Sequence, residues 1–238
     1  GFHDLHSHVV KLNWSDRIVL SASPMLTLAV DGPASAGIPT GKENLVMRAA
    51  HALAERTGRE AGASIRLTKH IPHGAGLGGG SSDAAAVLIG LRRLWSVGIT
   101  DDELASIGAE LGSDIPLFMR PGGAIIEGRG ERVRDWKCPW SGFAAIVVPS
   151  FGLATPAVYG CCEPREAGAA PRDPALSSDM NATELAKRLF NDLESPAFRV
   201  QPRLRTLHAS IDGLEGRRVR MTGSGSALFA LFDYLDEA

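Results

Sequence analysis

The sequence predicts a protein that mixes helices and strands, because both periodicities occur and a glycine-rich loop joins one to the other. Apolar residues recur at helical spacing over residues 43–57 and 82–95. Short runs of branched apolar residues, typical of strands, occupy residues 18–20, 25–30 and 63–70. Between the last of these strands and the second helix lies a loop with five glycines, which is the centre of the predicted functional site.

Composition limits the kind of protein this can be. Its 238 residues allow one large or two small domains, and 44% hydrophobic residues suffice for a buried core. A net charge of −2 with both signs interspersed gives no footprint for a nucleic acid or an anionic membrane. Cysteine is scarce, which favours a reducing cytoplasm. We expect no membrane span and no signal peptide, since no apolar run approaches the ~18 residues of a span.

The glycine loop is typical of a phosphate-binding site. Glycines permit positive φ and let backbone N–H groups approach an anion closely. Two serines then open an Ala- and Leu-rich helix, whose first turn attracts phosphate. The alternative is a flexible connector, but connectors rarely have such well-patterned flanks. The predicted cradle comprises Pro72, His73, Gly74, Ala75, Gly76, Leu77, Gly78, Gly79, Gly80, Ser81 and Ser82.

Two common nucleotide-binding motifs do not fit this loop. No Lys follows the glycines as in a P-loop, and no acidic residue follows at the distance that a dinucleotide fingerprint requires. The run Pro-x-Gly-Ala-Gly-Leu-Gly-Gly-Gly-Ser-Ser-Asp-Ala-Ala, starting at Pro72, resembles instead the ATP-binding motif of the GHMP small-molecule kinases. Within that family, the triple glycine followed by Ser-Ser-Asp resembles the diphosphocytidyl-methylerythritol kinases of the non-mevalonate isoprenoid pathway.

The resemblance implies an α+β fold of two domains. Residues 1–136 would form an ATP-binding domain like the second domain of ribosomal protein S5, and residues 137–238 a ferredoxin-like domain. The boundary lies at a break rich in Trp, Cys and Pro before the apolar run 143–148, which predicts a buried strand.

The first residues also resemble the family, with a shift in position. The Gly-aromatic-His start normally lies some two dozen residues into these kinases, so we expect their first strand and its catalytic Lys to precede this sequence, and a further helix to follow it. In these kinases the catalytic Lys lies in a Lys-x-Asn motif on that strand. Lys11-Leu12-Asn13 has the same pattern but comes after the aromatic-His segment, so we do not assign Lys11 as catalytic.

The chemistry implied by the resemblance is phosphorylation of the 2-hydroxyl of 4-diphosphocytidyl-2-C-methyl-D-erythritol with ATP and Mg²⁺. Asp114 lies in a Gly-Ser-Asp-x-Pro run that resembles the segment holding the family's catalytic aspartate, although an Asp there can also be an N-cap. A serine hydroxyl, assigned to Ser81, would lie near the metal ion.

Further residues are assigned through the resemblance, each with an ordinary alternative. Asn44 and Lys69 would lie near the nucleotide, but Asn44 can be an N-cap and Lys69 a solvated lysine at a strand end. Around the nucleobase of the small-molecule substrate we place Phe2, His3, Thr155 and Tyr159; the two aromatic residues and the histidine can instead be core. Residues 221–226 resemble the third GHMP motif, which packs against the phosphate loop, and residues 191–194 resemble a motif that we interpret as structural.

Two other functions remain open at this stage. Another GHMP kinase, acting on homoserine or mevalonate, would usually carry Gly-Leu-Gly-Ser-Ser-Ala in the loop. A non-catalytic nucleotide sensor would have no need of a base at Asp114. The sequence leaves the oligomeric state undecided.

Overall fold

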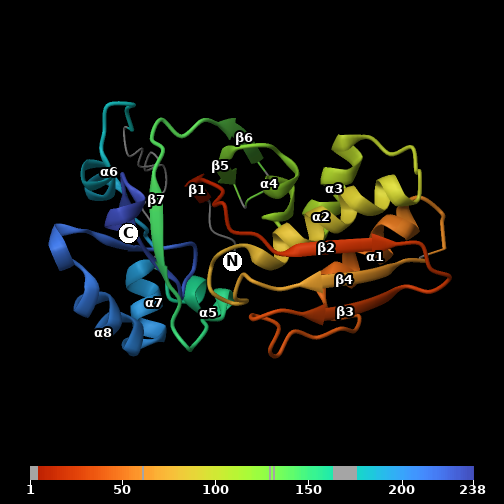
Figure 1. Cartoon of the computed structure of the whole chain (residues 1–238), viewed down its shortest axis with the longest axis horizontal. Helices are drawn as coiled ribbons and strands as arrows, with labels where there is room; N and C mark the ends of the chain where they lie inside the picture. The colour runs from red at the N-terminus through yellow and green to blue at the C-terminus, as the bar shows by residue number, and fades with distance from the viewer. Residues whose placement is uncertain (1–4, 61, 129, 131, 163–175) are drawn as a thin grey trace. The chain divides into compact units, whose positions relative to one another are not determined.

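The structure is a computed structural model, and it describes residues 5–60, 62–128, 130, 132–162 and 176–238 (Figure 1). The chain divides into two compact units. Unit 1 comprises residues Gly1–His73 and Gly78–Lys137, and unit 2 comprises Gly74–Leu77 and Cys138–Ala238. Both units contain helices and strands, as the predicted α+β class requires.

The main sheet of unit 1 surrounds the strand that leads into the glycine loop. Its strands are β2 (Arg17–Ser21), β3 (Thr27–Asp31) and β4 (Ser64–Thr68), in the order β2-β4-β3. The predicted strands β2 and β3 therefore do not pair with each other, because β4 lies between them, antiparallel to β2 and parallel to β3. Parallel neighbours need a crossover connection, and the chain between β3 and β4 provides it with a helix.

Helices cover one face of this sheet, and α1 and α2 lie behind it in the view of Figure 1. They are α1 (Leu45–Arg56), α2 (Gly79–Leu94) and α3 (Asp101–Leu111). In the sequence, Thr100 followed by Glu103 at the third position predicts a capping box that opens this helix. The capping box is present, because Thr100 and Glu103 exchange both hydrogen bonds. The three helices and β4 bury one apolar cluster, which includes Val46, Leu53, Ile65, Leu67, Val87, Leu88, Leu91, Leu104 and Ile107.

A second sheet of unit 1 packs against the short helix that precedes β5 in sequence. Strands β1 (Leu5–Val9), β5 (Gly123–Gly128) and β6 (Arg132–Trp136) form an antiparallel sheet in the order β1-β5-β6. Helix α4 (Ile115–Met119) packs against α2 and α3. Its Leu117 also joins Ala124 and Ile126 of β5 in a small core. This packing fixes the position of α4 beside α2, the helix that follows the glycine loop.

Unit 2 has an antiparallel sheet and a set of short helices. Its strands are β7 (Phe143–Val147), β8 (Val219–Met221) and β9 (Leu228–Phe232), in the order β7-β9-β8. Its helices are α5 (Thr155–Gly160), α6 (Ala182–Arg188), α7 (Glu194–Val200) and α8 (Pro202–Ile211), with the 3-10 turns η1 (Leu214–Gly216) and η2 (Leu235–Glu237). A core cluster joins α5, α7 and α8 to β8 and β9.

The predicted strand at residues 143–148 forms as β7, but it is not fully buried. Phe143 is 40% exposed and Val147 is 38% exposed. The reason is its place at the edge of the β7-β9-β8 sheet, where, among the described residues, β9 is its one neighbouring strand.

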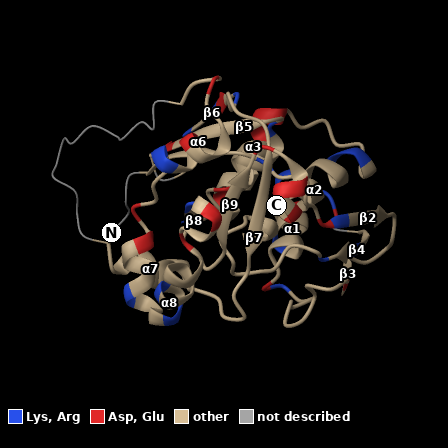
Figure 2. Ribbon diagram, turned by 60° about the vertical axis from the view of Figure 1, so that its left-hand side comes forward, with Lys and Arg blue, Asp and Glu red and all other residues tan. Residues whose placement is uncertain are grey.

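Charge is spread over the elements of both units. Lys and Arg residues and Asp and Glu residues occur on each of them (Figure 2), in keeping with the net charge of −2. Among the described residues, no helix combines the length and the apolar character needed to cross a membrane.

Candidate active site

The glycine loop between β4 and α2 takes backbone conformations that require glycine. Gly74, Gly76 and Gly78 have φ angles of 68°, 73° and 69°. A Cβ on Gly76 would lie 2.4 Å from the carbonyl oxygen of Thr222, and one on Gly78 would lie 2.6 Å from Cζ of Phe118. The positive φ that the glycines permit is thus present at three positions, and the loop has no room for side chains at Gly76 and Gly78.

Helix α2 begins three residues earlier than predicted, at Gly79. Gly78 is its N-cap residue, in left-handed conformation and without a side chain to bond the first N–H groups. Those N–H groups and the positive end of the helix dipole therefore remain available to an anion. Gly80 in the first turn is exposed, and a Cβ on it would meet no atom within 4 Å. The space beside Gly80 is therefore open.

The two serines of the motif lie inside the first turn of α2. Ser82 Oγ donates a hydrogen bond of 2.8 Å to the carbonyl oxygen of Gly79. Within the described part of the chain, the Ser81 hydroxyl has no such partner. Of the two, Ser81 therefore has the hydroxyl that is free for a ligand.

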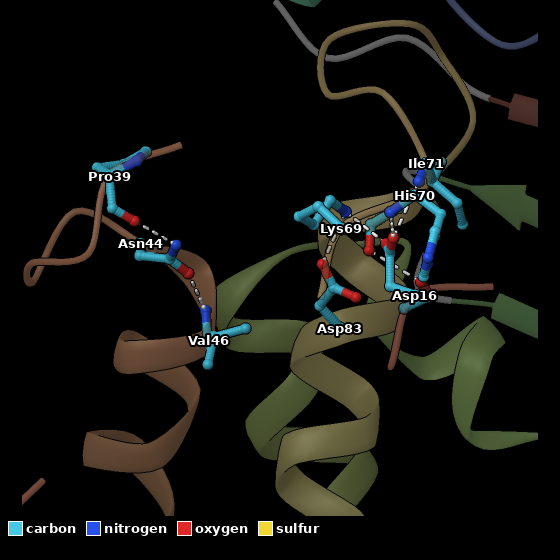
Figure 3. Close-up of polar contacts among 10 residues, drawn as sticks. Asp16, Pro39, Asn44, Val46, Lys69, His70, Ile71 and Asp83 are labelled. Atoms are coloured by element: carbon cyan, nitrogen blue, oxygen red, sulfur yellow. Dashed lines mark hydrogen bonds and ion pairs between the residues drawn. The ribbon is translucent and has the colours of Figure 1, made fainter. Parts of the chain in front are cut away.

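Next to the helix start, three charged side chains form a buried network (Figure 3). Lys69 Nζ lies 2.5 Å from Asp16 Oδ2 and 2.9 Å from Asp83 Oδ2. The side chains of Lys69 and Asp16 are each 2% exposed and that of Asp83 is 5% exposed. Asp16 Oδ1 also accepts hydrogen bonds from the backbone N–H groups of His70 and Ile71, at 2.5 and 2.9 Å. The network joins the chain before β2, the entry to the glycine loop and helix α2.

This network changes the role predicted for Lys69. Its ammonium is neither solvated nor free to reach a phosphate, because two buried carboxylates surround it. Burial raises the pKa of Asp83 to about 6, although the charge of Lys69 opposes the rise. Burial also acts to raise the pKa of Asp16, but the hydrogen bonds from Lys69 and from the two backbone N–H groups outweigh it and lower that pKa.

Asn44 is the N-cap residue of α1, which is the alternative role that the sequence allows for it. Its Oδ1 accepts a hydrogen bond of 2.8 Å from the Val46 N–H at the start of α1, and its Nδ2 donates one of 2.6 Å to the Pro39 carbonyl (Figure 3). The side chain is buried and bonded to backbone at both ends. These contacts support a structural role, and contact with a nucleotide stays a prediction.

Asp114 stands at the N-cap position of α4, but its side chain makes no capping hydrogen bond. The residue is exposed, yet partial desolvation of the carboxyl by the protein around it raises the pKa of Asp114. A hydrogen bond from the Ser113 hydroxyl acts to lower that pKa. Phe118, one turn further along α4, lies against Gly78. Residues four apart share a helix face, so Asp114 is on the side of α4 that meets the start of α2. A solvent-accessible carboxylate with a raised pKa has the properties of a general base.

The tip of the glycine loop, Gly74–Leu77, is bonded to the third motif within unit 2. The Ala227 N–H donates a hydrogen bond of 2.9 Å to the Ala75 carbonyl. The Thr222 hydroxyl donates one of 3.1 Å to the Gly76 carbonyl. The packing of the two motifs that the family resemblance implies is therefore present.

Of the four residues predicted to contact the nucleobase, the structure describes two, Thr155 and Tyr159. Phe2 and His3 lie outside the described residues. Thr155 is exposed in the first turn of α5, and its Oγ1 lies 2.8 Å from Ser224 Oγ in the third motif. Tyr159 is half-buried one turn further along α5, on the same face. Their contact with a substrate stays a prediction.

Sequence reasoning missed Asp16 and Phe118 as parts of this site. Asp16 is a lone acidic residue before a strand, and its partner Lys69 follows 53 residues later. Phe118 reads as an ordinary apolar residue of a short helix. In neither case does local spacing contain a signal; only the tertiary contact shows the role.

Comparison with known proteins gives matches along the chain. The family described as GHMP kinases N terminal domain matches residues 44–122, and the one described as GHMP kinases C terminal matches residues 174–238. A 4-diphosphocytidyl-2-C-methyl-D-erythritol kinase of Nocardia farcinica is 38% identical over 100% of this chain and 80% of its own length. The enzyme of the same name from Salinibacter ruber is 35% identical over 98% of this chain and 83% of its own length.

Solved structures agree with these matches. A crystal structure of 4-(cytidine 5'-diphospho)-2C-methyl-D-erythritol kinase superposes with a TM-score of 0.74 at 33% identity, covering 100% of this chain and 84% of that one. A homoserine kinase from Cytophaga hutchinsonii superposes with a TM-score of 0.65 at 18% identity, covering 95% of this chain and 79% of that one, which shows the shared fold alone. By sequence and by fold, the chain belongs to the 4-diphosphocytidyl-2-C-methyl-D-erythritol kinase family of the GHMP kinases.

Proposed function

We propose that this protein transfers the γ-phosphoryl group of ATP to the 2-hydroxyl of 4-diphosphocytidyl-2-C-methyl-D-erythritol. The observation that carries the proposal is the near full-length identity, 34–38% with several relatives of that name. The glycine loop, the open helix start and a carboxylate beside them supply the parts that such a reaction needs.

The phosphates of ATP would lie on the glycine loop and the first turn of α2. Three left-handed glycines present the backbone without Cβ atoms, and the first N–H groups of α2 are not capped by a side chain. Oriented N–H groups and a helix N-terminus together bind phosphate oxygens in many nucleotide sites. The open space before Gly80 fits a ligand there.

Asp114 would accept the proton of the substrate hydroxyl. As the hydroxyl oxygen forms its bond to the γ-phosphorus, the bond from that phosphorus to the leaving oxygen breaks, and ADP departs. The proton passes from the hydroxyl to the Asp114 carboxylate, which the raised pKa of this group favours.

A magnesium ion would neutralise charge on the β- and γ-phosphates when bound. Hard oxygen donors suit this ion, and the Ser81 hydroxyl fits because Ser82 is already bonded to the Gly79 carbonyl. The remaining ligands would come from phosphate oxygens and water, as is usual for Mg²⁺ at a nucleotide.

The cytosine base would be recognised by Phe2, His3, Thr155 and Tyr159. Aromatic faces stack on a base at about 1–3 kcal/mol each, and imidazole can bond its polar edge. Thr155 and Tyr159 share one face of α5, as such a site requires.

Steady-state assays with the full chain, ATP and Mg²⁺ test the proposal. We expect the cytidine compound to be phosphorylated, and homoserine, mevalonate and galactose to be ignored. Faster turnover of homoserine or mevalonate would place the protein elsewhere among the GHMP kinases. Binding of ATP without turnover of any acceptor would favour the sensor.

A further inference from the structure

Asn191, between α6 and α7, has every polar group of its amide engaged. Its Nδ2 donates hydrogen bonds to the carbonyl oxygens of Met221 and Gly223, at 2.9 and 2.8 Å. Its Oδ1 accepts a hydrogen bond of 2.9 Å from the Leu193 N–H. The two carbonyls belong to the residues on either side of Thr222, so one amide fixes both ends of the segment that presents the Thr222 side chain.

Glu194 supports the same segment from the first residue of α7. Its Oε1 accepts a hydrogen bond of 2.8 Å from the Met221 N–H. Its own N–H donates one of 3.0 Å to the Asn191 carbonyl. The motif at residues 191–194, which the sequence analysis interprets as structural, therefore hydrogen-bonds to the backbone of residues 221–223.

That backbone in turn holds the tip of the phosphate loop. The Thr222 hydroxyl donates to the Gly76 carbonyl, and a Cβ on Gly76 would lie 2.4 Å from the Thr222 carbonyl oxygen. The Ala227 N–H holds the preceding carbonyl, that of Ala75. The contact leaves no free space, so a shift of residues 221–223 must shift Gly76.

Holding these carbonyls also orients the N–H groups of the loop. In a planar trans peptide the C=O and the N–H that follows it point in opposite directions. With the carbonyls of Ala75 and Gly76 directed at the third motif, the N–H groups of Gly76 and Leu77 point away from it. Amide groups turned outward in this way are what a phosphate meets on a glycine-rich loop.

We infer that Asn191 is a positioning residue for ATP, acting through Thr222 on the carbonyl of Gly76. The inference rests on the proposed function, because it assigns to Asn191 the task of orienting the amide groups that hold the phosphates. It predicts an effect on nucleotide affinity and little effect on phosphoryl transfer once ATP is bound.

The test is a double-mutant cycle in the full chain with Asn191→Ala and Thr222→Val. Affinity for ATP with Mg²⁺ is measured by calorimetry, and KM and kcat are measured with the cytidine substrate. Loss of the two amide hydrogen bonds should weaken ATP binding by roughly tenfold, which corresponds to about 1.4 kcal/mol. The KM for ATP should rise in parallel while kcat at saturation stays within about twofold.

The cycle also tests the route. If Asn191 acts through Thr222, adding Asn191→Ala to Thr222→Val should weaken binding much less than it does in the wild type. Asn191→Asp keeps the acceptor for the Leu193 N–H but loses the two donors, so it should behave like Asn191→Ala. Asn181→Ala is the matched control, because Asn181 caps α6 by accepting from the Glu184 N–H and has no part in this loop.

The outcomes separate the inference from the proposed function. A wild-type chain that binds no ATP would contradict the proposed function. A wild type that binds ATP, with Asn191→Ala binding equally well, would overturn the inference alone. Equal weakening by Asn181→Ala would also overturn it, since the effect would then be general loss of stability.

Discussion

The buried network of Lys69, Asp16 and Asp83 allows a strong prediction for one substitution. Lys69→Met keeps the length of the side chain and removes the charge that balances two carboxylates, all with side chains at most 5% exposed. Breaking a buried ion pair by removing one partner costs about 3–5 kcal/mol. Since a domain is stable by about 5–15 kcal/mol in total, the variant should lose a large fraction of its stability.

The expected shift in melting temperature follows from chain size. For a chain of this length, each kcal/mol moves Tm by about 2–4 °C, so Lys69→Met should melt roughly 6–20 °C below the wild type at pH 7. The deficit should shrink at pH 5, because protonation of one carboxylate relieves the repulsion between the pair. The pKa of Asp83 is already about 6 with the lysine present, so this proton is bound readily.

Thermal unfolding followed by circular dichroism at pH 7 and pH 5 measures both effects. Lys42→Met is the matched control, because Lys42 is an exposed lysine of the same unit. Asp83→Asn added to Lys69→Met should recover part of the loss. A Lys69→Met protein that melts with the Lys42→Met control at pH 7 would refute the buried network.

Three further substitutions test other parts of the site. Gly80→Ala places a methyl group in the open space beside Gly80, so the affinity for ATP, measured by calorimetry, should fall at least tenfold. Tm should stay the same or rise, because Ala in a helix is favoured over Gly by up to ~1 kcal/mol. Asp114→Asn should lower kcat by about 10²–10⁴-fold without lowering Tm, since the side chain caps nothing; full activity would return the sensor to consideration. In the wild type, the raised pKa of Asp114 should shift the acidic limb of the pH profile of kcat to a pH above the usual pKa range of Asp. An unshifted limb would count against Asp114 as the base. Asp83→Asn should flatten the pH dependence of stability. With a pKa that rises from 3.8 to about 6 on folding, the wild type should lose roughly 2 kcal/mol of stability between pH 4 and pH 6, and an equal slope in the variant would contradict the assignment.

Local signals in the sequence were sufficient for much of the fold. The capping box at Thr100 depends on residues close together in the chain, and the structure has it as predicted. Glycines in the loop permit positive φ, and Gly74, Gly76 and Gly78 adopt it. The sequence predicts a start of α2 that is too late, because helix propensity disfavours glycine, whereas Gly79 and Gly80 are helical here. Tertiary context overrode the propensity at that point.

The roles of single charged residues were harder to predict. Lys69 at the end of a strand gives no sign that it will be buried, because its partners come from distant parts of the chain. Asp114 precedes Ile115-Pro116, where an Asp can cap the next helix, and only the structure shows that its side chain makes no capping hydrogen bond. Pattern and resemblance thus located the glycine loop and led to Asp114 as the proposed base, but they did not show the contacts that orient these residues.

The hydrogen bond from Thr222 to Gly76 also has a consequence for how the protein is made. Its partners are 146 residues apart. Ribosomes add roughly 5–20 residues per second, so about 7–30 s pass between synthesis of the glycine loop and synthesis of the segment that holds it. During that time β2, β3, β4 and α1, which all lie before residue 69, can already pair and pack. We therefore expect a nascent chain to acquire a folded core well before it can hold ATP, and to gain nucleotide affinity only after the segment around Thr222 has left the ribosome.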